Sequence, residues 1–242
     1  MIKVSHLTKT FGTLKAVDKL SLTVKKGEIY GFLGPNGAGK TTTIKILTGV
    51  LLPSEGQTTI SGFDIVNQSI SAKKIIGYIP DDPYVYPELS GREFLYFTGE
   101  LFLVKNLKQK IDRLLKIYHL EKIVDAPFKN YSRGNKQKLV ILAAFLHQPQ
   151  VLIIDEPILG LDPLSSQITI NLFKKFAQKG GTIFVSSHTL STIEKICHRV
   201  GIIDQGKLIF EGTLKDLQKK VKDQSSHLES LFLKLTTGPQ NN

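Results

Sequence analysis

The chain contains one cysteine, Cys197, among its 242 residues. A single thiol excludes a disulfide within the chain and is typical of proteins of the reducing cytoplasm. Long hydrophobic runs are also missing: the longest covers residues 139–146, whereas a membrane helix needs about 20 apolar residues. Residues 1–6 lack the apolar stretch of a secretory signal peptide. These absences predict a cytoplasmic protein.

Arginines are few and lysines are scattered along the chain, although the net charge is +11. Nucleic acid, an anionic membrane surface and simple solubility could each account for such a charge. No DNA- or RNA-reading motif is present, and we expect no specific nucleic-acid partner. With 41% hydrophobic and 22% charged residues, the composition is typical of a soluble globular protein with one large domain, or a core with a sub-domain.

Residues 34–41 read Gly-Pro-Asn-Gly-Ala-Gly-Lys-Thr and match the pattern of a phosphate-binding loop. Its glycines let several backbone N–H groups point at one phosphate, Lys40 adds a positive charge, and the Thr41 hydroxyl is a ligand for Mg²⁺. A buried strand over 28–33 and a helix from Lys40 frame the loop, which places a helix N-terminus at the phosphate. The predicted nucleotide-binding residues of this segment are Gly34, Pro35, Asn36, Gly37, Ala38, Gly39, Lys40, Thr41 and Thr42.

Carboxylates follow a second apolar stretch, residues 151–154, which predicts a buried strand. The carboxyl end of such a strand is where a parallel sheet places its ligand site. We therefore expect Asp155 to hold Mg²⁺ and Glu156 to polarise an attacking water. His188 follows the predicted strand 182–187 and should emerge at the same edge, where it could contact the γ-phosphate.

Strands and helices alternate over most of the chain, which predicts a mostly parallel sheet flanked by helices. Leu20, Leu22 and Val24 alternate with polar residues and predict an antiparallel strand at its edge. Residues 83–130 instead show helical spacing, for example Phe94, Phe97 and Leu101, and predict an inserted helical sub-domain. A charged amphipathic helix is expected from about 213 to 235, followed by a disordered tail at 236–242.

The order of these motifs resembles the nucleotide-binding subunit of ATP-binding-cassette (ABC) transporters, over residues 1–235. Further motifs carry the resemblance: an aromatic residue at Phe11, a glutamine-loop position at Asp81, a signature at 131–135 and a D-loop at 159–162. The signature and residues 86–93 look most like those of drug- and polysaccharide-export subunits. The resemblance implies an α/β P-loop cassette that binds ATP and Mg²⁺ and hydrolyses ATP.

In that family two cassettes pair head to tail, with each ATP between the phosphate loop of one and the signature of the other. The resemblance implies that Phe11 stacks on adenine and that Ser132 and Gly134 contact the partner's nucleotide. It further implies a separate transmembrane permease that meets the helical sub-domain on the inner face of the cell membrane. Lys40, Glu156 and His188 are the implied catalytic residues, and Thr41, Asp81 and Asp155 the implied metal ligands.

The motifs depart from the family pattern at four positions. Asp81 stands where glutamine is usual, and Arg133 and Asn135 stand where the signature commonly has glycine and glutamine. Ile158 replaces a threonine that is usual after Asp-Glu-Pro. Three other functions remain open. A soluble ABC ATPase of translation or DNA repair is disfavoured because there is one cassette and a short insert. A kinase or GTPase has no use for the signature, and a regulatory protein with vestigial hydrolysis would accommodate Asp81.

Overall fold

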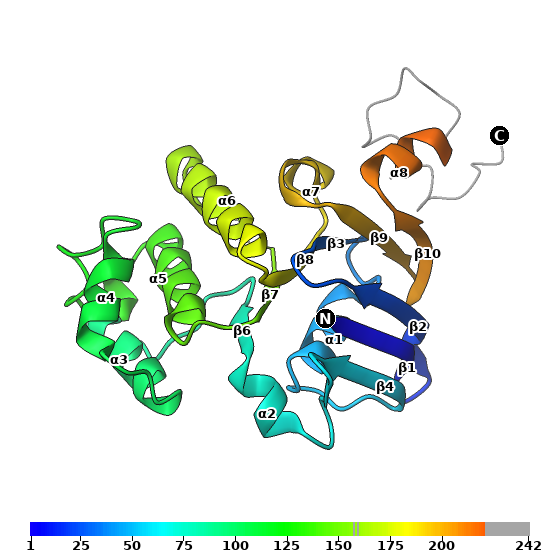
Figure 1. Ribbon diagram of the computed structural model, residues 1–242, viewed down its shortest axis with the longest axis horizontal. Helices are drawn as coiled ribbons and strands as arrows, with labels where there is room; N and C mark the ends of the chain where they lie inside the picture. The colour runs from blue at the N-terminus through cyan, green and yellow to red at the C-terminus, as the bar shows by residue number, and fades with distance from the viewer. Residues whose placement is uncertain (157, 159, 221–242) are drawn as a thin grey trace.

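The computed structural model describes residues 1–156, 158 and 160–220 and contains two β-sheets with helices around them (Figure 1). The larger sheet has the strand order β10-β9-β3-β8-β7-β6, and the smaller has the order β2-β1-β4-β5. The strands are β1 (Ile2–Phe11), β2 (Leu14–Val24), β3 (Ile29–Leu33), β4 (Glu55–Ile60), β5 (Phe63–Asp64), β6 (Ile76–Ile79), β7 (Val151–Asp155), β8 (Thr182–Ser187), β9 (Arg199–Asp204) and β10 (Lys207–Gly212). The α-helices are α1 (Lys40–Leu47), α2 (Ser69–Lys74), α3 (Gly91–Leu101), α4 (Leu107–Leu115), α5 (Arg133–Leu146), α6 (Pro163–Gln178), α7 (Leu190–Ile196) and α8 (Leu214–Lys220).

The larger sheet is parallel from β9 to β6, with β10 added antiparallel at its edge. Its register pairs Leu33 with Ser187 and Asp155 with Ser186. The carboxyl ends of β3, β7 and β8 therefore lie side by side. The loops that follow these three strands begin at one edge of the sheet, which confirms the predicted meeting place of the sequence motifs.

Alternate residues of the parallel strands belong to two hydrophobic cores. Ile183 and Val185 of β8 pack with α5, α6 and α7 on one face, whereas Phe184 packs with α1 and the smaller sheet on the other. The helices on one face and the smaller sheet with α1 on the other bury both faces of these strands. This explains why the strand sequences are continuous apolar runs.

The smaller sheet confirms the antiparallel strand expected at the edge of the fold, since Leu20, Leu22 and Val24 are all buried in β2. It is larger than expected, because β1 pairs with both β2 and β4. The end of the β1–β2 hairpin places the carbonyl of Ala16 close to Gly39 of the phosphate loop. The small sheet thus forms one wall beside that loop.

A helical layer formed by α3, α4 and α5 lies beside the β6 end of the large sheet (Figure 1). The predicted helical spacing in α3 is present, but Phe97 and Leu101 are exposed and Leu95 is buried. The α5 helix packs on α3 and α4 as well as on β6, so it joins this layer to the sheet. The boundaries 1–235 and 83–130 remain predictions.

The described part of the chain ends in α8, which covers the first residues of the helix expected over 213–235. The rest of that helix and the tail at 236–242 lie outside the described residues. Among residues 1–156, 158 and 160–220, no helix has the length and hydrophobicity to cross a membrane.

Candidate functional site

The loop between β3 and α1 packs so closely against its neighbours that two of its positions have no space for a side chain. A Cβ on Gly34 would lie 2.4 Å from the Ile203 carbonyl oxygen, and one on Gly39 would lie 2.4 Å from that of Ala16. Gly39 also has φ +107°, a conformation that glycine adopts without strain. It precedes α1, and no side chain caps the first N–H groups of that helix. The loop therefore presents free backbone donors, as anion binding requires.

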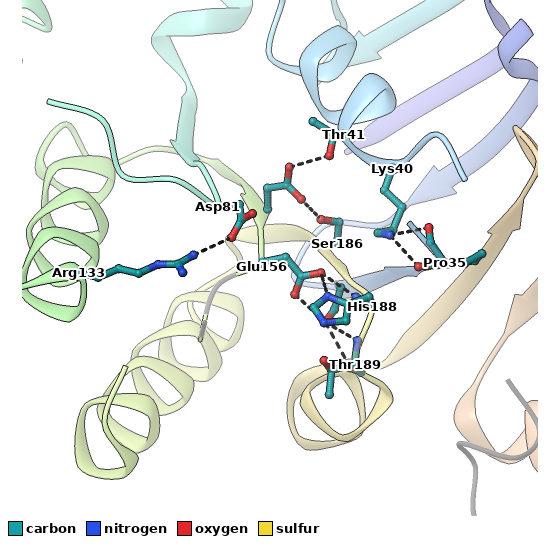
Figure 2. A network of polar contacts seen from close by, with 12 residues as sticks. Pro35, Lys40, Thr41, Asp81, Arg133, Glu156, Ser186, His188 and Thr189 are labelled. Carbon is teal, nitrogen blue, oxygen red and sulfur yellow. Dashed lines mark hydrogen bonds and ion pairs between the residues drawn. The ribbon is translucent and has the colours of Figure 1, made fainter. Parts of the chain in front are cut away.

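Lys40 points back into this loop. Its Nζ donates to the carbonyls of Gly34 at 2.7 Å and Pro35 at 2.9 Å (Figure 2). Burial lowers the pKa of Lys40, and the charges of Glu156 and Asp155 oppose that shift. Within the loop, Ala38 is buried, Asn36 is exposed and Thr42 is half-buried at the start of α1. The ammonium lies where a phosphate at this helix N-terminus would meet it.

Thr41 and Asp155 meet, as expected for two ligands of one metal ion. The Thr41 hydroxyl donates to Asp155 Oδ2 at 3.2 Å, and the Ser186 hydroxyl donates to Asp155 Oδ1 (Figure 2). Asp155 is buried at the end of β7. No cluster of three or more His, Cys, Asp or Glu side chains suited to a metal occurs in the described ranges. A hydroxyl beside a carboxylate still fits Mg²⁺, which usually takes few protein ligands and completes its shell with water and phosphate oxygens.

Glu156 and His188 form a second pair at the same edge. Glu156 Oε1 accepts from the His188 backbone N–H and lies 2.7 Å from His188 Nδ1, and Glu156 Oε2 accepts from the Ser187 hydroxyl at 3.1 Å. A contact of that length between a nitrogen and a carboxylate oxygen needs a proton on Nδ1. Nε2 is then the ring atom left to meet a further group. Glu156 has φ +50°, which turns its side chain from the strand toward His188.

Asp81 follows β6 and is turned toward the signature segment. Its Oδ1 lies 3.6 Å from Arg133 Nη2 (Figure 2). Burial is the main cause that raises the Asp81 pKa, and the charge of Asp155 adds to it. Asp81 is thus within electrostatic reach of Asp155, but it makes no hydrogen bond to Thr41 or Asp155. Its role as a metal ligand remains a prediction.

Ser132 and Gly134 lie at the N-terminus of α5. The Ser132 hydroxyl accepts from Asn135 N at 3.3 Å and caps the helix, which confirms the predicted cap. Gly134 packs against the loop before α6, because a Cβ there would lie 2.9 Å from the Gly160 carbonyl oxygen. Ser132 itself is exposed. This helix end has no hydrogen bond to the chain's own phosphate loop among the described residues.

Phe11 ends β1 with its ring about half exposed, and the Lys9 ammonium lies 5.1 Å from the ring centroid. Phe11 is the strand partner of Leu14 in the β1–β2 hairpin, and Leu14 lies two residues before Ala16. An exposed aromatic ring on the hairpin whose Ala16 approaches the phosphate loop is suited to stacking on a base, and this role stays a prediction.

The sequence motifs did not indicate Ser186 and Ser187. Both are buried at the end of β8 and hold the two carboxylates, Asp155 and Glu156. The sequence does show two adjacent serines directly before His188. That they hold these carboxylates depends on the register of β7 against β8, which places Ser186 opposite Asp155. The paired residues of these strands lie 31 positions apart in the chain, and their register is set by the whole sheet.

The comparisons with known proteins agree with this geometry. The sequence pattern of the ABC transporter family matches residues 17–159. The bacitracin transport ATP-binding protein BcrA of Bacillus licheniformis is 41% identical over 221 residues, which cover 91% of this chain and 72% of that protein. The linearmycin resistance ATP-binding protein LnrL of Bacillus subtilis is 35% identical over 219 residues, covering 90% and 70%.

A solved structure described as the ATP-binding subunit of an ABC transporter superposes with a TM-score of 0.91 at 30% identity, covering 97% of this chain and 99% of that one. A dimeric ATP-binding cassette bound to ADP and phosphate shares the fold, with a TM-score of 0.80 at 23% identity, covering 88% and 99%. The P-loop α/β fold inferred from the motifs is thereby confirmed. The chain belongs to the ABC transporter family and is an ATP-binding subunit that hydrolyses ATP to power transport.

Proposed function

We propose that this chain drives a drug exporter through a separately encoded transmembrane permease. The support comes from relatives named for bacitracin transport, linearmycin resistance and multidrug transport. The signature and the segment 86–93 resemble those of drug- and polysaccharide-export subunits, and the names of these relatives favour drugs. In this arrangement the chain lies on the cytoplasmic face of the cell membrane, bound to the permease.

One observation carries the chemistry: the ends of three parallel strands bring Lys40, Asp155 and Glu156 to one edge. Lys40 exchanges the Gly34 and Pro35 carbonyls for phosphate oxygens. Bound Mg²⁺ would supply positive charge between Thr41, Asp155 and the phosphates. The Glu156 carboxylate orients the attacking water and accepts its proton, and His188 holds that carboxylate through Nδ1. His188 Nε2 is available to the γ-phosphate.

A second copy of the chain completes each site in this proposal. The Ser132 and Gly134 backbone lies at an exposed helix N-terminus, which would face the γ-phosphate bound by the partner. Phe11 would stack on the adenine. The permease would contact the helical layer of α3, α4 and α5.

Affinity purification from detergent-solubilised membranes, followed by drug-sensitivity assays, tests the proposal. We expect a polytopic membrane protein to co-purify with both the wild type and Glu156→Gln. Cells with the wild type should tolerate a drug better than cells with Glu156→Gln, because only the wild type turns over ATP. Co-purification with ribosomes or DNA-repair proteins in place of a membrane protein would support the soluble alternative.

A further inference from the structure

Arg133 connects its own segment to two others that are far away in sequence. It is the first residue of α5, directly after the Ser132 cap. Its aliphatic stem lies over Gly160, where an added Cβ would sit 3.3 Å from Arg133 Cδ and 3.4 Å from Cγ. Its guanidinium then reaches Asp81 Oδ1 at 3.6 Å (Figure 2). The side chain therefore links the signature, the loop before α6 and the segment after β6.

Asp81 presents a carboxylate that has one buried oxygen. Oδ1 is shielded from solvent and receives no hydrogen bond from the described residues, although the side chain as a whole is 46% exposed. Arg133 Nη2, 3.6 Å from Oδ1, is the cation that pairs with this carboxylate among the described residues. Without Arg133, the carboxylate would add an uncompensated negative charge near the site of a triphosphate.

Two of the residues that depart from the family pattern, Asp81 and Arg133, thus pair with each other. We propose that Arg133 is a positioning residue for Asp81: it holds and neutralises the carboxylate before Mg–ATP binds, and releases it when the metal's charge takes over. A glutamine at position 81 would carry no charge and would need no such partner. Arg133 is more exposed than Asp81, at 55%, so an unpaired guanidinium turns into solvent and is screened, whereas the carboxylate stays at the site.

Binding of a fluorescent, non-hydrolysable ATP analogue in EDTA tests the pairing, at protein concentrations where the chain is monomeric. Arg133→Met keeps the stem over Gly160 and removes the charge, so we expect about fivefold weaker binding. Asp81→Asn and the double variant should both bind within about twofold of the wild type, because no uncompensated carboxylate remains. Arg133→Lys should restore most of the affinity, since it restores the charge.

Arg113→Met is the matched control, because Arg113 is an exposed arginine of α4 in the same helical layer. It should leave the affinity unchanged, and thermal unfolding should show that every variant is folded. If Arg133→Met weakened binding equally in the Asp81→Asn background, Arg133 would act on the nucleotide directly and the pairing would be wrong. Unchanged binding by Arg133→Met would also overturn it.

Repeating the titration with Mg²⁺ tests the release. The deficit of Arg133→Met should shrink to within about twofold, because the metal compensates Asp81 in its place. An undiminished deficit would contradict the release and leave only the pairing. The EDTA measurement involves neither a metal nor a permease, so its result is independent of the proposed metal site and of transport.

Discussion

Single residues at the carboxyl edge of the large sheet are held by short contacts to other parts of the chain. Lys40 is bound by two backbone carbonyls, and Glu156 is bound by His188 and Ser187. Lys40 can exchange the two carbonyls for phosphate oxygens, whereas Glu156 can keep its contacts to His188 and Ser187 while it meets a water. Preorganised groups of this kind contribute to catalysis because little reorganisation is left for the reaction itself.

Lys40→Ala should abolish detectable hydrolysis and weaken ATP binding. It removes a cation directed at the β- and γ-phosphates, and loss of one such donor typically costs about 10²–10³ in rate. Steady-state ATPase assays and nucleotide titrations measure both effects. Lys45→Ala, an exposed lysine on the same helix, is the control and should behave as the wild type. Wild-type turnover by Lys40→Ala would place the nucleotide elsewhere.

Glu156→Gln should retain ATP binding and slow hydrolysis by about two orders of magnitude or more. The amide oxygen can still accept from His188, and the amide nitrogen can donate to Ser187, so the local geometry persists. Single-turnover hydrolysis should fall while the affinity for ATP stays within a few-fold. A variant that hydrolysed ATP at the wild-type rate would exclude Glu156 as the base.

The residues with a local signal could be predicted from sequence, whereas those defined by a distant partner could not. The phosphate loop, Asp155, Glu156 and His188 each follow a strand within a short motif. Ser186 and the Arg133–Asp81 pair depend instead on strand register and on helix placement across the site. No pattern within a short window encodes such pairings.

Among the secondary-structure elements, α3 shows why helical spacing alone did not identify the buried face. Its Gly99 packs closely on α4, because a Cβ there would lie 2.1 Å from Leu107 Cδ1. A glycine on the packed face allows this close approach. Phe97 and Leu101 lie on the part of the helix surface that is exposed to solvent. In β1, register shifts between Val4 and Thr10 break the period of two that marks a strand. That strand is therefore not evident from the sequence.

The capping role of Ser132 can be separated from its proposed role at the partner's nucleotide. Ser132→Asp keeps a capping oxygen and adds a negative charge at the helix end, so stability should hold while hydrolysis falls severalfold or more. Ser132→Ala loses the cap, which costs about 1 kcal/mol or about 2–4 °C in melting temperature. Unimpaired hydrolysis by Ser132→Asp would place this helix end away from the γ-phosphate.

Asp162 at the start of α6 predicts a pH dependence. Its pKa is held well below the usual 3.8, first by the Ser165 hydroxyl, then by the Ser165 backbone N–H and by Lys138. A folded-state pKa below the unfolded value stabilises the protein above the unfolded pKa, and this contribution is lost as pH falls through the folded pKa. Melting temperatures measured below about pH 4 should therefore fall less steeply for Asp162→Asn, which can still cap the helix. If the melting temperatures of the wild type and Asp162→Asn fell in parallel with pH, other carboxyl groups would account for the acid sensitivity.

At the scale of the whole molecule, the two cores fix the phosphate loop and the signature on different layers. The loop lies between the parallel sheet and the small sheet, and the signature helix belongs to the helical layer. In the proposed arrangement each cassette carries both halves of a nucleotide site, and no hydrogen bond among its described residues joins them. A two-fold symmetric pair can join them twice, since in such an interface each surface meets its counterpart reciprocally.

Mixing two inactive variants tests this arrangement. Lys40→Ala disables the phosphate loop, and Ser132→Arg blocks the signature, so neither homodimer should hydrolyse ATP. In a head-to-tail heterodimer, one site joins the intact phosphate loop of the Ser132→Arg chain to the intact signature of the Lys40→Ala chain. Random pairing of equal amounts makes about half of the dimers mixed, with one of two sites intact, so about a quarter of the wild-type rate should return. If the mixture stayed as inactive as its components, each chain would have to use its own signature, and the head-to-tail pairing would be wrong.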